Sequence, residues 1–145
     1  MTWPTPRAGL VIRYSYLWRR EAEAGRDEGV KDRPCAIVVA VKTEAGETIV
    51  YALPITHTPP RAVDDALELP KATKDRLGLD SDRSWIMITE ANIFAWPGPD
   101  LRFIQGGGPE SIAYGMLPPK LIALVRERFV KLLQARRAGL VQRTD

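Results

Sequence analysis

Four polar side chains flank two apolar segments of the sequence. Glu28 lies five residues before Arg33, Arg33 directly precedes the apolar run 34–41, and Thr56 and His57 follow the apolar run 48–55. If these runs form an antiparallel hairpin, the start of the first lies beside the end of the second, so Arg33 and Thr56 face one pocket. A carboxylate that accepts a proton, a guanidinium fork and hydroxyl donors suit attack at a phosphodiester, where negative charge grows on the phosphate oxygens.

The same residues also fit a simpler arrangement. A surface salt bridge between Glu28 and Arg33, next to a threonine at a strand end, has the same sequence pattern. His57 is either a proton-transfer group or a hydrogen-bonded bystander at the end of its strand. The residues alone therefore leave both a catalytic pocket and a structural ion pair open.

Cysteine and aspartate usage argues against a metal centre. With one cysteine and one histidine, the chain has neither a disulfide framework nor a multi-cysteine zinc site. Asp64-Asp65 and the pair Asp80 and Asp82 offer carboxylate oxygens, but aspartate is common in turns because it bonds to the local backbone. No metal is therefore expected.

Known catalytic and cofactor motifs are also missing from the sequence. Gly106-Gly107-Gly108 is not followed by the Lys-Ser/Thr of a phosphate loop, and the serine nucleophile elbow is absent. Cys35, between a proline and an apolar run, is expected to be a buried small hydrophobe rather than a nucleophile. The sequence thus predicts no cofactor.

Short β-rich segments separated by turns make up most of the chain. The continuous apolar run 34–41 is typical of a central strand buried on both faces. The charged segment 19–32 is expected to be a mobile surface loop. Strands are expected at 9–18, 34–41, 48–55, 66–70 and 84–90, with shorter ones at 101–104 and 112–117, and turns at 45–47 and 77–80.

One amphipathic helix is expected near the C-terminal end, over residues 119–138. Pro118-Pro119 opens it and Gly139 ends it. Residues 118–145 hold seven of the 21 Lys and Arg residues and two acidic ones, so the other 117 residues sum to −2 although the chain carries +3. Positive charge gathered in one terminal helix indicates a nucleic-acid groove less strongly than a basic stripe across the fold.

These elements predict one mainly β domain over residues 1–145, a small barrel at about 9–117 closed by the helix at about 119–138. A doubly wound α/β fold is excluded because no helical pattern separates the strands. The apolar share of 45% supports a folded core. Without an apolar run of membrane-spanning length or a signal peptide, the protein is expected to be soluble and cytoplasmic, with no membrane partner.

Around Glu28, Arg33 and Thr56, the sequence resembles the MazF/PemK (Kid-like) toxins of type II toxin–antitoxin systems. Gly9-Leu10-Val11 approximates the opening strand of that family, and 28–39 reproduces its Glu, Arg-Pro and apolar strand. Pro54-Ile55-Thr56 meets the Pro-x-Thr strand end. Segments 78–79 and 85–92 resemble the turn and the strand that follow in the family. Gly115-Met116-Leu117-Pro118 matches the motif that precedes the family's amphipathic helix. The similarity runs over about residues 9–135.

The resemblance implies an SH3-like barrel, a homodimer and a cognate antitoxin. It also implies metal-independent endoribonuclease activity on single-stranded RNA, in which the 2′-OH of the RNA attacks the adjacent phosphate. Carried over to this chain, Glu28 is the general base or its partner. Arg33 is the acid or the transition-state clamp, with electrostatic stabilisation the safer role for a permanently charged group. Thr56 is a hydroxyl contact to the phosphate.

The sequence departs from the family around residues 88–92. There Thr89 or Glu90 stands for the family's acidic residue, and Asn92 occupies the place of a usual Lys or Arg, so these three and His57 are accessory candidates. The segments 96–102 and 106–108 look like insertions. Two alternatives stay open: a non-catalytic SH3-like module that binds nucleic acid or protein, and a gyrase poison of the CcdB type.

Overall fold

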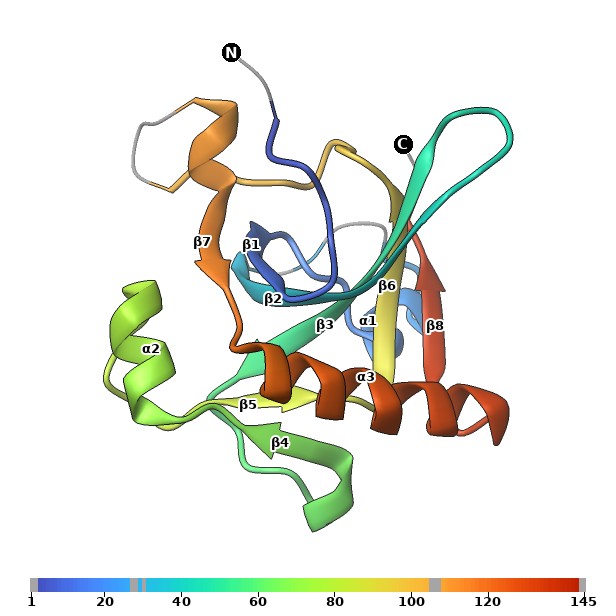
Figure 1. The fold of residues 1–145 in the computed structure, drawn as a ribbon. Coiled ribbons are helices and arrows are strands. Elements are labelled where there is room, and N and C mark those ends of the chain that lie inside the picture. The colour runs from blue at the N-terminus through green and yellow to red at the C-terminus, as the bar shows by residue number, and fades with distance from the viewer. Residues whose placement is uncertain (1–2, 27–28, 30, 105–107, 144–145) are drawn as a thin grey trace.

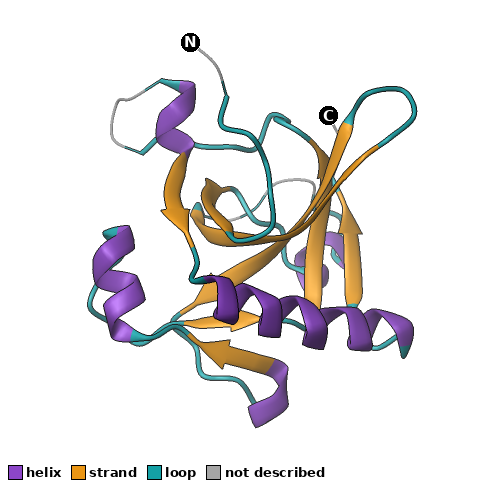
Figure 2. Ribbon diagram, in the orientation of Figure 1, coloured by secondary structure: helices purple, strands orange, loops and turns teal. Residues whose placement is uncertain are grey.

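The computed structural model describes residues 3–26, 29, 31–104 and 108–143. This part of the chain is mainly β, as the sequence predicts (Figures 1 and 2). Its helices are α1 (Arg19–Glu23), α2 (Lys71–Leu77) and α3 (Pro119–Gln134), with short 3-10 turns η1 (Val63–Asp65) and η2 (Pro109–Ile112). Its strands are β1 (Leu10–Tyr14), β2 (Arg33–Lys42), β3 (Thr48–Thr56), β4 (Ala66–Glu68), β5 (Trp85–Met87), β6 (Glu90–Ala95), β7 (Ala113–Met116) and β8 (Gly139–Gln142).

All of these strands belong to one sheet. Its main path runs β4-β5-β3-β2-β1-β7, while β6 pairs with the first half of β3 and carries β8 on its other side. The β6–β8 pair is parallel, and the other strand pairs are antiparallel. Within the described ranges no pairing joins the outer strands β4, β7 and β8 to one another, so the sheet is open and a closed small barrel is not confirmed.

Alternating side chains of β2 and β3 divide the core into two clusters. Ala36 and Val38 face one cluster, whereas Cys35 and Ile37 face the other, and all four are fully buried. The two-residue period of a strand produces this division, because successive side chains point to opposite faces. The expectation of a central strand buried on both faces is therefore confirmed for Cys35 to Val38, and so is the buried Cys35.

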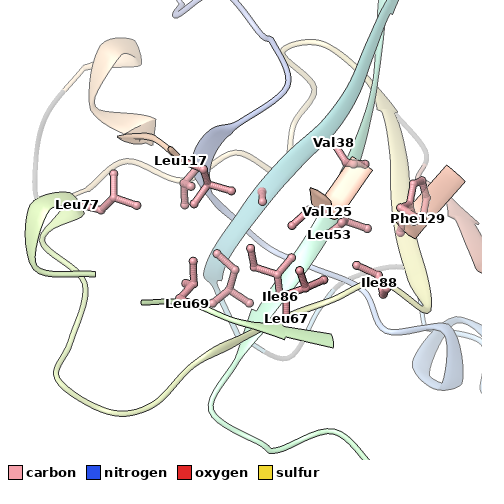
Figure 3. Packing of buried hydrophobic residues seen from close by; sticks show 14 residues of the cluster. Val38, Leu53, Leu67, Leu69, Leu77, Ile86, Ile88, Leu117, Val125 and Phe129 are labelled. Atoms are coloured by element: carbon pink, nitrogen blue, oxygen red, sulfur yellow. The ribbon is translucent and has the colours of Figure 1, made fainter. Parts of the chain in front are cut away.

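Helix α3 covers one of the two clusters. Val125 and Phe129 are its fully buried residues, and they point toward Val38 and Leu53 in Figure 3. The helix ends at Gln134 rather than at 138, because residues 135–138 turn the chain back through the positive φ of Arg136. Strand β8 follows, an element that the sequence analysis did not predict.

Other expectations at the element level were partly wrong. The segment 19–32 is not wholly a loop, since it begins with α1. Residues 71–77, left without an element, form α2, and the expected strand 84–90 stops at Met87, after which β6 starts at Glu90. The expected strand at 101–104 is reduced to a single bridge between Leu101 and Tyr14. In the described chain, no helix has the length and apolar character required to cross a membrane.

Candidate active site

The beginning of β2 and the end of β3 open into a cavity of about 560 Å³. Arg33, Thr56 and His57 all line it, so the structure brings these three residues together at one cavity. The strand register explains this: Cys35 lies opposite Pro54, and continuing the antiparallel pairing by two residues sets Arg33 opposite Thr56. The segment that links β1 to α1 and the turn after α2 complete the wall.

The guanidinium of Arg33 is held against an aromatic ring. Its Cζ lies 5.0 Å from the ring centroid of Trp18, and Cζ of Arg20 lies 5.1 Å from the same ring. Both arginines and Trp18 line the cavity. Nε of Arg33 is buried and has no hydrogen-bond partner among the described residues. A buried N–H without a partner costs free energy, and an oxygen-rich ligand in the cavity would satisfy it.

The carboxylates of the cavity wall are engaged by partners. Glu21 accepts a hydrogen bond from the backbone N–H of Trp18 at 3.0 Å. Asp32 forms ion pairs with Arg13 at 3.7 Å and with Arg102 at 3.6 Å, two arginines that do not line the cavity.

Asp80, the third of these carboxylates, is paired with Lys74, another cation outside the cavity wall. By contrast, Arg20, Lys31 and Arg33 form no close ion pair in the part of the chain that the structure describes, although Arg20 attracts Glu90 at longer range. Because Asp32 and Asp80 are paired with cations outside the wall, Glu21 is the one described lining carboxylate without a cationic partner, against three lining cations.

Three charged or titratable groups form a chain that starts at the cavity wall with His57 and Asp80 and ends outside it at Lys74. Nε2 of His57 lies 2.8 Å from Oδ2 of Asp80, and Nζ of Lys74 donates to Oδ1 of Asp80 at 2.8 Å. Lys74 is only 4% exposed and also donates to the Asp82 carbonyl and to Oγ of Ser84. The hydrogen bond from Lys74 holds the pKa of Asp80 below its usual value, and the bond with His57 adds to this effect.

The end of α2 explains how Asp80 reaches this position. Gly78 has φ +71°, in the left-handed region that glycine adopts at little cost. The backbone N–H of Leu79 then bonds to the carbonyl of Lys74 at 3.0 Å, which turns the chain back over the helix. Asp80 consequently lies above the Lys74 side chain and beside His57 at the end of β3.

Three of the accessory candidates do not reach the cavity: Thr89, Glu90 and Asn92 are absent from its lining. The carbonyl of Thr89 accepts a hydrogen bond from Gly139 of β8. Glu90 accepts from the hydroxyl of Tyr16 and the N–H of Arg19, both at 3.0 Å, and burial raises its pKa. The structure therefore does not bring these three accessory candidates to the cavity that Arg33 and Thr56 line.

Asn92 has a structural position in the segment beside the cavity. It is fully buried, accepts from the N–H of Leu17 at 2.9 Å and donates to the carbonyl of Leu17 at 2.7 Å. Arg143 donates to its Oδ1 at 3.0 Å. Asn92 thus fixes the segment between Tyr16 and Trp18, two residues that line the cavity.

Glu28, the expected general base, lies outside the described residues, as do Gly106 and Gly107. Asp64 and Asp65 lie in η1, which does not border the cavity. Among the described side chains, His57, Asp80 and Asp82 bring possible metal-ligand atoms within 4.8 Å of one another. The ammonium of Lys74 already bonds to Asp80 and to the Asp82 carbonyl. A lysine of the chain therefore balances negative charge in this cluster.

Sequence reasoning missed Trp18, Arg20 and Lys74 as parts of the site. Lys74 lies on a helix that was not predicted, and Asp80 was considered only as a turn residue or metal ligand. A tryptophan followed two residues later by an arginine carries no specific signal. In comparisons with known proteins, no family model matches the chain, and no curated protein or solved structure shows a significant similarity to it.

Proposed function

We propose that this protein is an endoribonuclease that cleaves single-stranded RNA without a metal ion, through attack of the substrate's own 2′-OH on the adjacent phosphate. The observation that carries the proposal is the meeting of Arg33, Thr56 and His57 at one cavity, where the buried Nε of Arg33 has no hydrogen-bond partner among the described residues. The resemblance to the MazF/PemK toxins around Arg33 and Thr56 supports the same reaction class.

Arg33 is the residue best suited to the phosphate. A guanidinium binds two phosphate oxygens at once, and its contact with Trp18 keeps it in place before the substrate arrives. Charge on the non-bridging oxygens increases in the transition state, so a preorganised cation stabilises that state more than the bound substrate. Thr56 supplies a hydroxyl at the opposite strand end, and its Oγ1 also accepts from the N–H of Thr58 at 3.1 Å.

Two further features favour RNA over other polyanions. The guanidinium planes of Arg20 and Arg33, which lie over the ring of Trp18, are the surfaces on which we expect unpaired bases to stack, as in other proteins that bind single strands. The attacking 2′-OH is present in RNA and absent from DNA. The reaction therefore predicts products with a 2′,3′-cyclic phosphate and a 5′-OH.

Purified protein incubated with long single-stranded RNA in EDTA tests this proposal. We expect fragments whose 5′ ends accept phosphate directly from polynucleotide kinase, and no cleavage of DNA of the same sequence. Arg33→Ala should reduce the rate of cleavage about 100-fold or more. Removal of one preorganised group that stabilises the charge of a transition state typically lowers the rate by that factor. Arg128→Ala, which removes an exposed arginine of α3, is the matched control and should cleave normally.

RNA that stays whole with the wild-type protein would overturn the enzymatic proposal. If such RNA is nevertheless bound, the protein is a non-catalytic binding module on the same site. Arg33→Ala that cleaves at the wild-type rate would remove Arg33 from the reaction. Trapping of cleaved DNA in the presence of DNA gyrase would instead indicate the gyrase-poison alternative.

We further propose that the protein acts as a toxin with a cognate antitoxin and as a homodimer with an SH3-like architecture. The long hairpin β2–β3, shared by two hydrophobic clusters, supports this relation although the sheet is open. Expression in a bacterial host should arrest growth, and Arg33→Ala should relieve the arrest. Co-expression with the small acidic product of a neighbouring reading frame should relieve it as well.

A further inference from the structure

His57, Asp80 and Lys74 form a connected chain from the cavity wall to a buried ammonium group. The side chains of His57 and Asp80 are each 53% exposed, whereas that of Lys74 is 5% exposed. A lysine is rarely buried to this degree unless its charge is matched by partners. Here it has three, of which Asp80 is the charged one.

We propose that His57 is the general base of the reaction, that it acts through Nδ1, and that Asp80 and Lys74 are positioning residues that set its tautomer. This inference rests on the proposed ribonuclease function and names the group that removes the proton from the 2′-OH.

The tautomer follows from the hydrogen bonds. Lys74 stabilises Asp80 as a carboxylate, and the lowered pKa of Asp80 keeps it ionised at neutral pH. An ionised carboxylate has no proton to donate, so in the 2.8 Å contact with Oδ2 it is Nε2 of His57 that carries the hydrogen. In a neutral imidazole the other nitrogen, Nδ1, then has a free lone pair and can accept a proton.

The charged groups around His57 support this role. One carboxylate oxygen of Asp80 and one of Asp82 lie within 4.8 Å of a ring nitrogen of His57, so negative charge lies beside the ring when it accepts a proton. Lys74 acts on the ring through Asp80. The remaining charged residues that border the cavity are Arg20, Glu21, Lys31, Asp32 and Arg33.

The proposed step needs no reactant other than the RNA and water. Nδ1 of His57 takes the proton of the 2′-OH while the 2′-oxygen forms a bond to phosphorus and the bond from phosphorus to the 5′-oxygen breaks. The leaving 5′-oxygen takes a proton from water, and the imidazolium returns its proton to solvent. The ionised Asp80 stabilises the imidazolium without itself becoming protonated.

The chain offers a direct test because it has one histidine. Nitrogen-15 NMR of the wild-type protein should show, at a pH where the ring is neutral, that Nε2 carries the proton. Asp80→Asn should change the tautomer ratio, whereas Asp75→Asn, which removes an exposed carboxylate of α2 paired with Lys71, should leave it unchanged.

Kinetics supply the second readout. His57→Asn should lower kcat for RNA cleavage at least 100-fold with little change in KM, and should abolish the rise of the rate with pH. Asp80→Asn should also lower kcat, because a neutral amide does not stabilise the imidazolium that forms during the reaction. Lys74→Met should lower kcat as well, whereas its control Lys71→Met should not.

Failure of this inference is distinct from failure of the proposed function. RNA left intact by the wild-type protein defeats the function, whatever the tautomer. RNA cleaved equally well by wild type and His57→Asn defeats the inference and leaves the function standing. A proton found on Nδ1 instead of Nε2 also defeats the inference. Because His57 is an exposed residue at a strand end, its replacement tests chemistry rather than folding.

Discussion

At the scale of single residues, the salient feature is an ammonium group buried beside a half-exposed carboxylate. Lys74 brings its charge under the turn that follows α2, where water cannot fully solvate it. Its attraction to Asp80 offsets part of that desolvation, and the carbonyl of Asp82 and hydroxyl of Ser84 occupy its remaining donors. The pair therefore couples the local fold to the protonation of Asp80.

Asp80→Asn should lower the free energy of unfolding at pH 7 by about 1–2 kcal/mol, because it leaves a buried ammonium without its counter-charge at a partly solvated site. The folded pKa of Asp80 lies below its usual value of 3.8. Its contribution is thus complete above that value and is lost as the pH falls through the lowered folded pKa.

Urea unfolding at pH 7 and at about pH 2 measures this effect. The difference between wild type and Asp80→Asn should be present at pH 7 and shrink at the lower pH. The control Asp75→Asn should change stability by less than about 0.5 kcal/mol at both, since its ion pair is exposed. An equal loss in Asp80→Asn at both pH values would contradict the assignment.

At the scale of elements, the site depends on the way in which α2 ends. A helix of seven residues contributes little stability by itself, and its packing and cap define it. Leu77 belongs to the core cluster that α3 covers, and the left-handed Gly78 begins the turn that carries Asp80 to His57.

Gly78→Ala should destabilise the protein by about 1 kcal/mol and reduce RNA cleavage. An added Cβ at Gly78 meets nothing within 4 Å, so the cost is one of backbone conformation rather than of packing. Gly46, at φ +90° in the tip of the β2–β3 hairpin, is equally unobstructed and serves as the control. Gly46→Ala should lose similar stability in urea unfolding yet cleave normally, and equal losses of activity would contradict the role of the turn.

The sequence predicts the elements that have long apolar patterns and misses those that tertiary packing defines. Strands β2 and β3 and helix α3 each bury a periodic set of side chains, and all three were predicted. Helix α2, with Thr73, Lys74 and Leu77 as its buried residues, has no such stripe. The four residues of β8 alternate between buried and exposed, but so short a run gives no clear signal.

The same distinction applies to the site. Arg33, Thr56 and His57 flank the two strands of one hairpin, and their proximity follows from antiparallel pairing alone. The partners of His57 could not be predicted, since the contact of Lys74 with Asp80 depends on an unpredicted helix and its cap. The position of Asn92 could not be predicted either, because its burial and its bonds to Leu17 arise from the packing of the β1–α1 segment against β6.

At the scale of the whole molecule, one arginine connects segments that are distant in the sequence. Arg143, directly after β8, is 5% exposed and donates to the carbonyl of Ser15 at 2.6 Å as well as to Asn92. It also pairs with Asp100 at 3.1 Å. These contacts tie the end of β8 to the segment that leads from β1 to the cavity.

Arg143→Met should lower the free energy of unfolding by about 3–5 kcal/mol, because it leaves the largely buried carboxylate of Asp100 without this cation. Arg137→Met, at an exposed position beyond α3, should have almost no effect. Unfolding in urea monitored by tryptophan fluorescence gives both values. A loss below about 1 kcal/mol for Arg143→Met would show that the network is dispensable.

The late place of Arg143 in the chain has a consequence for biosynthesis. A growing polypeptide on the ribosome cannot complete the bonds to Ser15, Asn92 and Asp100 until residue 143 has emerged from the exit tunnel. The segment that carries Trp18 is therefore fastened only after every residue that lines the cavity, up to Ser84, has been translated. A protein assembled in this order would complete the proposed RNA-binding cavity well after the synthesis of its lining.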